Sequence, residues 1–377
     1  MSKVLLFSHD FGGANTIIPL VKKLRKRNCN VLLYGKNYSL KKYLAFGLDS
    51  KNIDDEINSE IYTDVLNFVK KEKPDLIITG TSAEDFTEKY LWIAANSLKI
   101  PTCAILDQWM NYGVRFSKYP VSLIEEYEKE KKHDYMPSKI AVMDDYAKKE
   151  AILEGLDEDK IIITGQPYFD LLLDWKKSIT KINFNSLKSK LGINQSDFVI
   201  TYISDYISSI YGNMFGYTDL TVFQELINAL DIVARDKNIK ISLIIKRHPT
   251  EENDLYTPLI KNFNNKNIKF ILVDNLYNPF DLIGMSDLLC GISSIMLIES
   301  LIIGKPIISI QIGLKRKSFF PLDSRGLVKS IMDSQDLIQK IISIIENKEN
   351  RCEFNILSDA ASNLINKLEV LYGKIGS

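Results

Sequence analysis

Short apolar runs alternate with amphipathic stretches along this chain, and the alternation occurs in two blocks. In the first block, apolar runs such as Val4–Ser8 and Leu76–Thr79 are separated by helical patterns such as Asn15–Arg27. Continuous apolar strands joined by helices indicate βαβ units, in which helices cover both faces of a parallel sheet. The pattern resumes at Phe198–Ile203 after a polar interval. We therefore predict an α/β fold of two Rossmann-like, doubly wound parallel-sheet domains with a ligand cleft between them.

The length supports two domains, because 377 residues exceed what one hydrophobic core usually holds. The polar interval, which is rich in Lys, Asn and Ser, separates them. We assign residues 1–174 to an N-terminal domain, 175–196 to a linker and 197–350 to a C-terminal domain. Residues 351–377 contain a last helix that could pack back on the first domain.

Charge and cysteine content narrow the class of protein. Lys+Arg and Asp+Glu balance at 48 each, which argues against nucleic-acid binding driven by bulk charge. The four cysteines are far apart and form no CxxC pair, so we expect reduced cytoplasmic thiols and neither a disulfide framework nor a zinc site. No run of 18 apolar residues occurs, so we expect no membrane span, while peripheral contact with the inner face of a membrane stays open.

The loop after the first strand combines titratable groups with glycines. His9 and Asp10 end the strand, and Gly12 and Gly13 follow at the start of a helix. Paired glycines let the backbone turn and approach a ligand, and a helix start offers free N–H groups. His9 or Asp10 has the chemistry of a general base toward an acceptor hydroxyl. A tight turn with Asn15 as helix cap explains the glycines equally well.

The loop after Thr102–Leu106 carries an acid, two aromatic residues and an arginine within ten residues. Loops of this composition line sites more often than they fill cores. Asp107 could serve as the base and Arg115 could orient hydroxyls or a carboxylate, while Trp109 or Tyr112 stacks on a sugar ring. An interior loop that plugs the domain explains the same residues.

Two further turns follow strands in this block. Gln166 lies in a glycine–proline turn near the end of the first domain and is a candidate cleft residue. Ser82 and Asp85 match a capping-box pattern, which favours a structural role for both.

The second block carries the stronger signals. Lys246, Arg247 and His248 end a strand and precede Pro249. Three cationic or titratable groups at a strand end, ahead of a helix, favour a phosphate or diphosphate. A chance cluster of surface charges is the plainer alternative.

A second phosphate signal follows another strand. Gly291 ends that strand, and Ser293 and Ser294 begin a helix whose hydroxyl and N–H groups suit phosphate oxygens. Glu299 lies more than one turn further along this apolar helix and suits ribose hydroxyls, because a carboxylate in such surroundings needs a partner. A serine cap with a solvated glutamate is the alternative.

These segments resemble known motifs. The donor-nucleotide motif of GT-B glycosyltransferases and of UDP-N-acetylglucosamine 2-epimerases is similar to Gly291, Ser293, Ser294, Glu299 and Gly304-Lys305-Pro306. Two epimerase motifs are similar to Thr164-Gly165-Gln166 with Asp170, and to His248-Pro249. The His-Pro pair also resembles the phosphate-site motif of CDP-glycerol glycerophosphotransferases.

The resemblance implies that Ser293 and Ser294 hold the diphosphate, Glu299 the ribose, and His248 a phosphate or the reacting centre. Residues 1–174 would then form the acceptor-side domain and 197–350 the nucleotide-binding domain. The epimerases carry paired acids where this chain has only Glu299, and the loop at His9 is closer to the acceptor-side loop of the transferases. Group transfer is therefore preferred over epimerisation.

The leading hypothesis is transfer of a sugar from a UDP- or CDP-linked donor to a hydroxyl of a bacterial-type surface glycan or lipid-linked acceptor. Lys246, Arg247 and His248 would stabilise the departing diphosphate without a metal or another cofactor. The alternatives are a sugar-nucleotide 2-epimerase, an alditol-phosphate transferase that releases CMP, and a nucleotide-sugar-binding regulator that has lost its chemistry.

Overall fold

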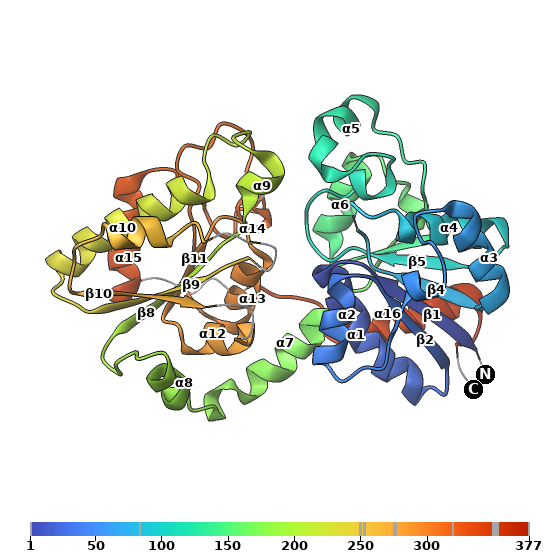
Figure 1. Ribbon diagram of the computed structural model, residues 1–377, viewed down its shortest axis with the longest axis horizontal. Coiled ribbons are helices and arrows are strands. Elements are labelled where there is room, and N and C mark those ends of the chain that lie inside the picture. The colour runs from blue at the N-terminus through green and yellow to red at the C-terminus, as the bar shows by residue number, and fades with distance from the viewer. Residues whose placement is uncertain are drawn as a thin grey trace. The chain divides into compact units, whose positions relative to one another are not determined.

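The structure is a computed structural model that describes residues 2–82, 84–248, 251, 254–273, 277–318, 320–348 and 354–375. The chain divides into two compact units. Unit 1 consists of Met1–Leu171 with Ile356–Ser377, and unit 2 of Leu172–Asn355. Each unit is built around a parallel sheet with helices, as Figure 1 shows.

In the described part of unit 1, seven strands form one parallel sheet in the order β3-β2-β1-β4-β5-β6-β7. The strands are Lys3–Ser8 (β1), Asn30–Gly35 (β2), Lys51–Asn52 (β3), Leu76–Thr79 (β4), Thr102–Ile105 (β5), Lys139–Val142 (β6) and Ile161–Ile163 (β7). The main helices are Phe11–Lys26 (α1), Tyr38–Ala45 (α2), Tyr62–Glu72 (α3), Thr87–Ser97 (α4), Ile124–Glu130 (α5), Asp145–Leu153 (α6), and Ala360–Tyr372 (α16).

Strand β1 shows why both faces of this sheet are covered. Val4 and Leu6 point to one face and pack in a cluster with α1 and α16. Leu5 and Phe7 point to the other face and pack in a cluster with α3 and α4. Since side chains alternate along a strand, four consecutive apolar residues supply two separate cores.

In the described part of unit 2, five strands form a parallel sheet in the order β10-β9-β8-β11-β12. They are Phe198–Ile203 (β8), Ile241–Lys246 (β9), Ile268–Val273 (β10), Leu288–Gly291 (β11) and Ile307–Ser309 (β12). The helices are Asn185–Lys190 (α8), Ile207–Tyr211 (α9), Asp219–Asp236 (α10), Thr257–Lys261 (α11), Pro279–Met285 (α12), Ile295–Ile303 (α13), Pro321–Ser324 (α14) and Ser334–Ile345 (α15).

The two sheets share one topology, with the order of strands reversing next to the first strand of each unit. In unit 1 the reversal falls between β1 and β4, and in unit 2 between β8 and β11. Ligands of doubly wound sheets bind outside the carboxyl ends of the strands at this point. The predicted fold class is confirmed. The topology predicts that ligands bind at the loops after these four strands.

Two predictions differ from the structure. The helix predicted over Asn15–Arg27 begins earlier, at Phe11. The interval 175–196 is not a separate linker, because the helix α7 (Pro167–Ser178) runs into it and α8 follows within unit 2. Beyond β12, Ile310 and Ile331 form an isolated bridge.

Helix α16 completes unit 1 although it comes last in the chain. It lies beside α1, so that the red and blue ends of the chain meet in Figure 1. The carboxylate of Asp170 accepts hydrogen bonds from the N–H groups of Ala360 (2.8 Å) and Ala361 (3.0 Å) at its first turn. Arg27 contacts Glu369 at 2.8 Å near its last turn.

Candidate functional site

The loop after β1 holds a histidine–aspartate pair. Nδ1 of His9 donates a hydrogen bond of 2.5 Å to Oδ1 of Asp10. The His9 side chain is 11% exposed, whereas that of Asp10 is 43% exposed. Asp10 is therefore the member of the pair that faces solvent, and His9 is its buried support.

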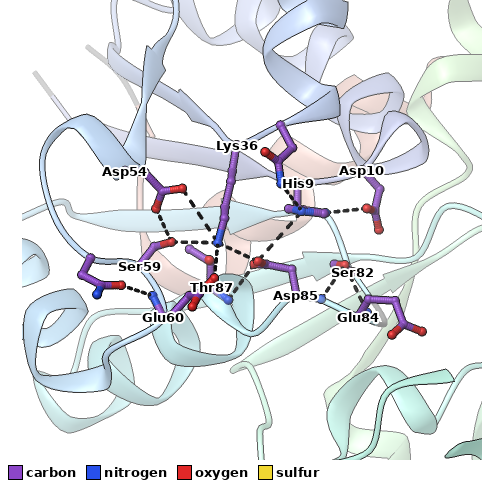
Figure 2. Close-up of polar contacts among 12 residues, drawn as sticks. His9, Asp10, Lys36, Asp54, Ser59, Glu60, Ser82, Glu84, Asp85 and Thr87 are labelled. Atoms are coloured by element: carbon purple, nitrogen blue, oxygen red, sulfur yellow. Dashed lines mark hydrogen bonds and ion pairs between the residues drawn. The ribbon is translucent and has the colours of Figure 1, made fainter. Parts of the chain in front are cut away.

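The other edge of the His9 ring faces two loops from neighbouring strands (Figure 2). Nε2 lies 3.1 Å from the side-chain amide of Asn37, which follows β2. It lies 3.9 Å from Oδ2 of Asp85, which follows β4. The ring is therefore held between two carboxylates from different loops.

Lys36 links these loops. Its buried ammonium lies 2.9 Å from Oδ2 of Asp85 and 3.1 Å from Oγ of Ser59. Asp54 at 3.9 Å and Glu60 at 3.8 Å complete the acidic surroundings shown in Figure 2. Because burial of an ammonium is unfavourable without partners, this ring of acceptors accounts for the position of Lys36.

The charges set the protonation of these groups. Burial lowers the pKa of His9, but the hydrogen bond and charge of Asp10, together with the charge of Asp85, outweigh it and raise that pKa above its usual value. Burial raises the pKa of Asp85, but its hydrogen bonds to Thr87 and Lys36 and the charge of His9 prevail and lower it. The result is an imidazole that readily carries a proton beside an exposed carboxylate.

Asp107 and Arg115 meet next to this loop. A guanidinium N–H of Arg115 donates to Oδ1 of Asp107 at 2.8 Å and to the backbone carbonyl of Thr81 at 2.8 Å. Gln166 donates to the backbone carbonyl of Asp107 at 3.1 Å. The structure thus brings together three of the predicted site residues, with Arg115 buried and committed to these partners.

Gly12 and Gly13 allow close packing. The predicted backbone turn at these glycines is wrong. Both lie within the first turn of α1. A Cβ on Gly12 would lie 1.8 Å from Oδ2 of Asp107, and one on Gly13 would lie 3.1 Å from Cβ of Ser8. A Cβ on Gly80 would lie 2.8 Å from Cα of Gly13. The two glycines let α1 start directly against the loops after β4 and β5.

A buried glutamate lies below this contact. Glu88 accepts a hydrogen bond from the N–H of Ser82, and a Cβ on Gly80 would lie 3.0 Å from its Oε1. Burial, supported by the charge of Asp10, raises the pKa of Glu88 well above its usual value. Burial therefore disfavours the charged form of Glu88, whereas the side chain of Asp10 faces solvent.

Trp109 and Tyr112 do not form a sugar-stacking surface, which corrects the prediction for them. Trp109 is 5% exposed, donates to Asp144 at 3.0 Å and stacks on Phe169. Tyr112 is 2% exposed. Their apolar rings fill the interior of unit 1, so the alternative of a plugging loop describes them.

In unit 2, the cationic segment lies at the end of β9. Lys246 is its last residue and is buried, and Arg247 and His248 follow it and are partly buried. Burial and the charge of Lys246 lower the pKa of His248 to about 4. His248 is therefore neutral at pH 7, with its ring stacked on Tyr206 at a centroid distance of 6.4 Å. Pro249 lies outside the described residues.

The serine pair lies where the sequence predicts it, at the start of α13. Ser294 is the N-cap residue, and its Oγ accepts a hydrogen bond from the N–H of Met296. Ser293 and Ser294 are partly exposed, whereas Glu299 is buried on the next turn of the helix. Gly291 permits close approach of β8, since a Cβ there would lie 3.0 Å from the carbonyl oxygen of Ile203.

Sequence reasoning missed a carboxylate at this helix start. Oδ2 of Asp205, in the loop after β8, accepts hydrogen bonds from N–H (2.5 Å) and Oγ (2.9 Å) of Ser293. It also missed Lys36 and Asn37 after β2. The signal available for all three was their position just beyond a predicted strand, which many other polar residues share.

Among the described residues, no cluster of three or more His, Cys, Asp or Glu side chains has the arrangement of a metal site. None of the helices in the same ranges combines the length and apolar character that crossing a membrane requires.

The fold is that of the GT-B enzymes. It matches the UDP-GlcNAc 2-epimerase of Neisseria meningitidis, solved with UDP-GlcNAc, at 17% identity and a TM-score of 0.67, over 97% of this chain and 99% of that chain. The UDP-GlcNAc 2-epimerase of Methanocaldococcus jannaschii matches at 16% identity and a TM-score of 0.67, over 98% of this chain and 100% of that chain. MurG of Acinetobacter baumannii matches at 9% identity and a TM-score of 0.53, over 98% of this chain and 100% of that chain. No curated protein matches the chain by sequence.

Two doubly wound units with polar loops at their strand ends define a protein of the GT-B fold class. Within that class, residues 116–360 match the family model described as CDP-Glycerol:Poly(glycerophosphate) glycerophosphotransferase. The chain belongs to this family. The family and the fold together support an enzyme that uses a nucleotide-activated substrate, and they confirm the resemblance drawn from the sequence.

Proposed function

We propose that this protein transfers an alditol phosphate, of the glycerol phosphate class, from a CDP-linked donor to a hydroxyl group of a phosphate-containing polymer. The family match supports the donor class. The observation that carries the transfer reaction is the exposed Asp10 carboxylate hydrogen-bonded to His9, because such a pair can accept a proton from an attacking hydroxyl.

In this proposal unit 1 serves the acceptor. The acceptor oxygen attacks the phosphorus that carries the alditol, and its proton passes to the Asp10–His9 pair. Asp85 and Lys36 hold the His9 ring in place by ion pairing, so they act as positioning residues. Burial disfavours a negative charge on Glu88, which lies beside the same loops.

Unit 2 serves the donor. As the new phosphorus–oxygen bond forms, the bond between that phosphorus and the bridging oxygen of the diphosphate breaks, and CMP departs with the electron pair. Lys246, Arg247 and the N–H groups at the start of α13 supply positive charge for this leaving group. Neutral His248 offers a hydrogen bond and no net charge.

Sugar transfer from a nucleoside-diphosphate sugar would use the same groups, and it stays a prediction of the sequence. The reaction would differ in the bond that breaks, because the sugar carbon and not phosphorus would be attacked. A nucleoside diphosphate would then be released in place of CMP. The acceptor and a position at the inner face of the membrane also remain proposals.

The test is incubation with CDP-glycerol and a short glycerol phosphate oligomer, with release of CMP and growth of the oligomer followed by chromatography. We expect both products to form together. UDP-N-acetylglucosamine incubated without an acceptor serves as the competing substrate. Epimer formation in that reaction, with no CMP from CDP-glycerol, would reject the proposal in favour of epimerisation.

A further inference from the structure

The anion-binding position at the start of α13 already holds a carboxylate of the protein itself. Asp205 follows β8, and Ser293 follows β11, which is the neighbouring strand at the point where the order of the sheet reverses. Oδ2 of Asp205 accepts hydrogen bonds from both the N–H and the hydroxyl of Ser293, at 2.5 and 2.9 Å. A phosphate oxygen bound to this helix start would use the same two donors.

The loop that carries Asp205 is fixed by the residues that follow it. Tyr206, the next residue, has a left-handed backbone with φ of 51° and stacks on His248. The carboxylate of Asp219 accepts hydrogen bonds from the N–H groups of Ile207 (3.0 Å) and Ser208 (2.9 Å). A non-glycine residue in this conformation is held by its surroundings, so the loop joins the two candidate phosphate contacts, His248 and Ser293.

A buried phenol supplies a second observation at this position. The hydroxyl of Tyr217 is buried without a hydrogen-bond partner among the described residues, and Tyr217 is 2% exposed. Its charge interactions include those with Asp205 and Asp219. A buried hydroxyl without a partner is costly, and an incoming anion would give it an acceptor.

We infer that Asp205 is an internal competitor for the phosphate group of the donor, and that it gives up its contact with Ser293 by taking up a proton from solvent when the donor binds. The inference rests on the proposed function only for the identity of the anion. Its consequence is that the free protein discriminates against anions at high pH and accepts them more readily as the pH falls.

The surroundings of Asp205 support an anion affinity that rises as the pH falls. Burial raises its pKa to about 7, with a further increase from Asp219, while hydrogen bonds from Ser293 and Ser294 act in the opposite direction. The nearby phenols of Tyr202, Tyr217 and Tyr256 have raised pKa values and stay neutral. His248, with a pKa of about 4, stays neutral above pH 6.

Among the described residues of this neighbourhood, Glu251 is a further group that could titrate. It accepts a hydrogen bond from Ser204 at 2.8 Å, and burial raises its pKa. It is retained in an Asp205→Asn variant, so any pH dependence left in that variant comes from groups other than Asp205, such as Glu251. Below its pKa Asp205 is neutral, so competition is absent; above it, each pH unit weakens anion binding by about tenfold.

The experiment measures binding of sulfate and of CDP-glycerol by calorimetry between pH 6 and pH 8. Neither anion changes its charge in this range. We expect wild-type affinity to fall about tenfold from pH 6 to pH 8, and the Asp205→Asn variant to bind about tenfold more tightly than wild type at pH 8 and equally at pH 6. The matched control is Asp197→Asn. Asp197 is a buried aspartate at the opposite end of β8 and accepts a hydrogen bond from Ser242.

The outcomes separate the two proposals. Weaker or unchanged sulfate binding by Asp205→Asn at pH 8, or the same behaviour in Asp197→Asn, would overturn the competitor role. Sulfate behaving as expected while CDP-glycerol fails to bind would support the competitor role and reject the donor class. If Asp205→Asn does not fold, proton uptake by wild type on sulfate binding at pH 7, measured in two buffers, decides: about half a proton supports the inference and none overturns it.

Discussion

Gly12 and Asp107 are so close that a single methyl group at Gly12 would overlap the carboxylate, with 1.8 Å between the new Cβ and Oδ2. Asp107 cannot move away freely because Arg115 holds its other oxygen at 2.8 Å. The contact joins the first turn of α1 to the loop after β5. It makes the position of that loop depend on a residue that has no side chain.

The first prediction follows from this contact. Gly12→Ala should destabilise the protein by about 1–3 kcal/mol, because the added methyl group overpacks a closed site. The measurement is the free energy of unfolding in denaturant. In an Asp107→Ala background the space is already open, so the same change should cost much less, and equal costs in both backgrounds would contradict the contact.

The second prediction concerns the protonation of His9. Asp85→Asn should lower the pKa of His9, because the charge of Asp85 raises it, whereas Lys36→Met should raise it, because the charge of Lys36 lowers it. NMR titration of the imidazole signals can measure both shifts, since the chain has three histidines. Shifts of the same sign in the two variants would contradict the proposed ion-pair arrangement.

The raised pKa of His9 also gives stability a pH dependence. A histidine whose folded pKa exceeds its unfolded value stabilises the native state fully below the unfolded value of about 6.5. This contribution is lost as pH rises through the folded pKa. A His9→Gln variant should lack that loss, which a series of unfolding curves from pH 6 to pH 9 would detect.

The third prediction concerns the proposed chemistry. Asp10→Asn and His9→Gln should each reduce kcat by about 10²–10⁴-fold, the usual contribution of general-base catalysis. Donor affinity should change little, because both residues belong to unit 1. The double variant should lose little more than either single variant if the two residues act as a pair.

Its matched control is Asp157→Asn, which neutralises an exposed aspartate of the same unit. Steady-state rates of CMP release provide the measurement. A large effect in the control, or a large change in KM for CDP-glycerol in Asp10→Asn, would place the role of Asp10 outside proton transfer.

The fourth prediction concerns His248. Its pKa of about 4 lies below the unfolded value of about 6.5, so the folded state resists protonation. The unfolded state then binds more protons between these values, and stability falls as the pH falls through this window, by at most about 3 kcal/mol. His248→Gln should remove this acid penalty, and an equal loss of stability in both proteins from pH 6.5 to pH 4 would contradict the lowered pKa.

Much of the fold and part of the site could be predicted from the sequence. Strands such as β4 and β8 have the predicted bounds because continuous apolar runs mark buried parallel strands. His9, Asp10, Ser293 and Ser294 were identifiable because they directly follow such strands. The strand order could not be read from this pattern, and it is the order that brings the loops after β2 and β4 to the loop after β1.

Lys36 and Asp85 illustrate what was missed. Lys36 is one of 48 basic residues, and nothing local marks it as buried. Asp85 was predicted to cap a helix, and it does accept the N–H of Thr87 at 2.8 Å. The same carboxylate also pairs with Lys36, a relation that only the assembled sheet creates.

The return of α16 to unit 1 has a consequence for synthesis of the chain. Its residues Ala361, Leu364, Ile365 and Leu368 are fully buried in the cluster that covers one face of the first sheet. During translation, the apolar side chains of α1 that contact α16 therefore stay exposed until the ribosome has produced all of unit 2. The nascent protein passes through a stage in which its second half can finish folding before its first, and shielding by chaperones would matter most in that interval.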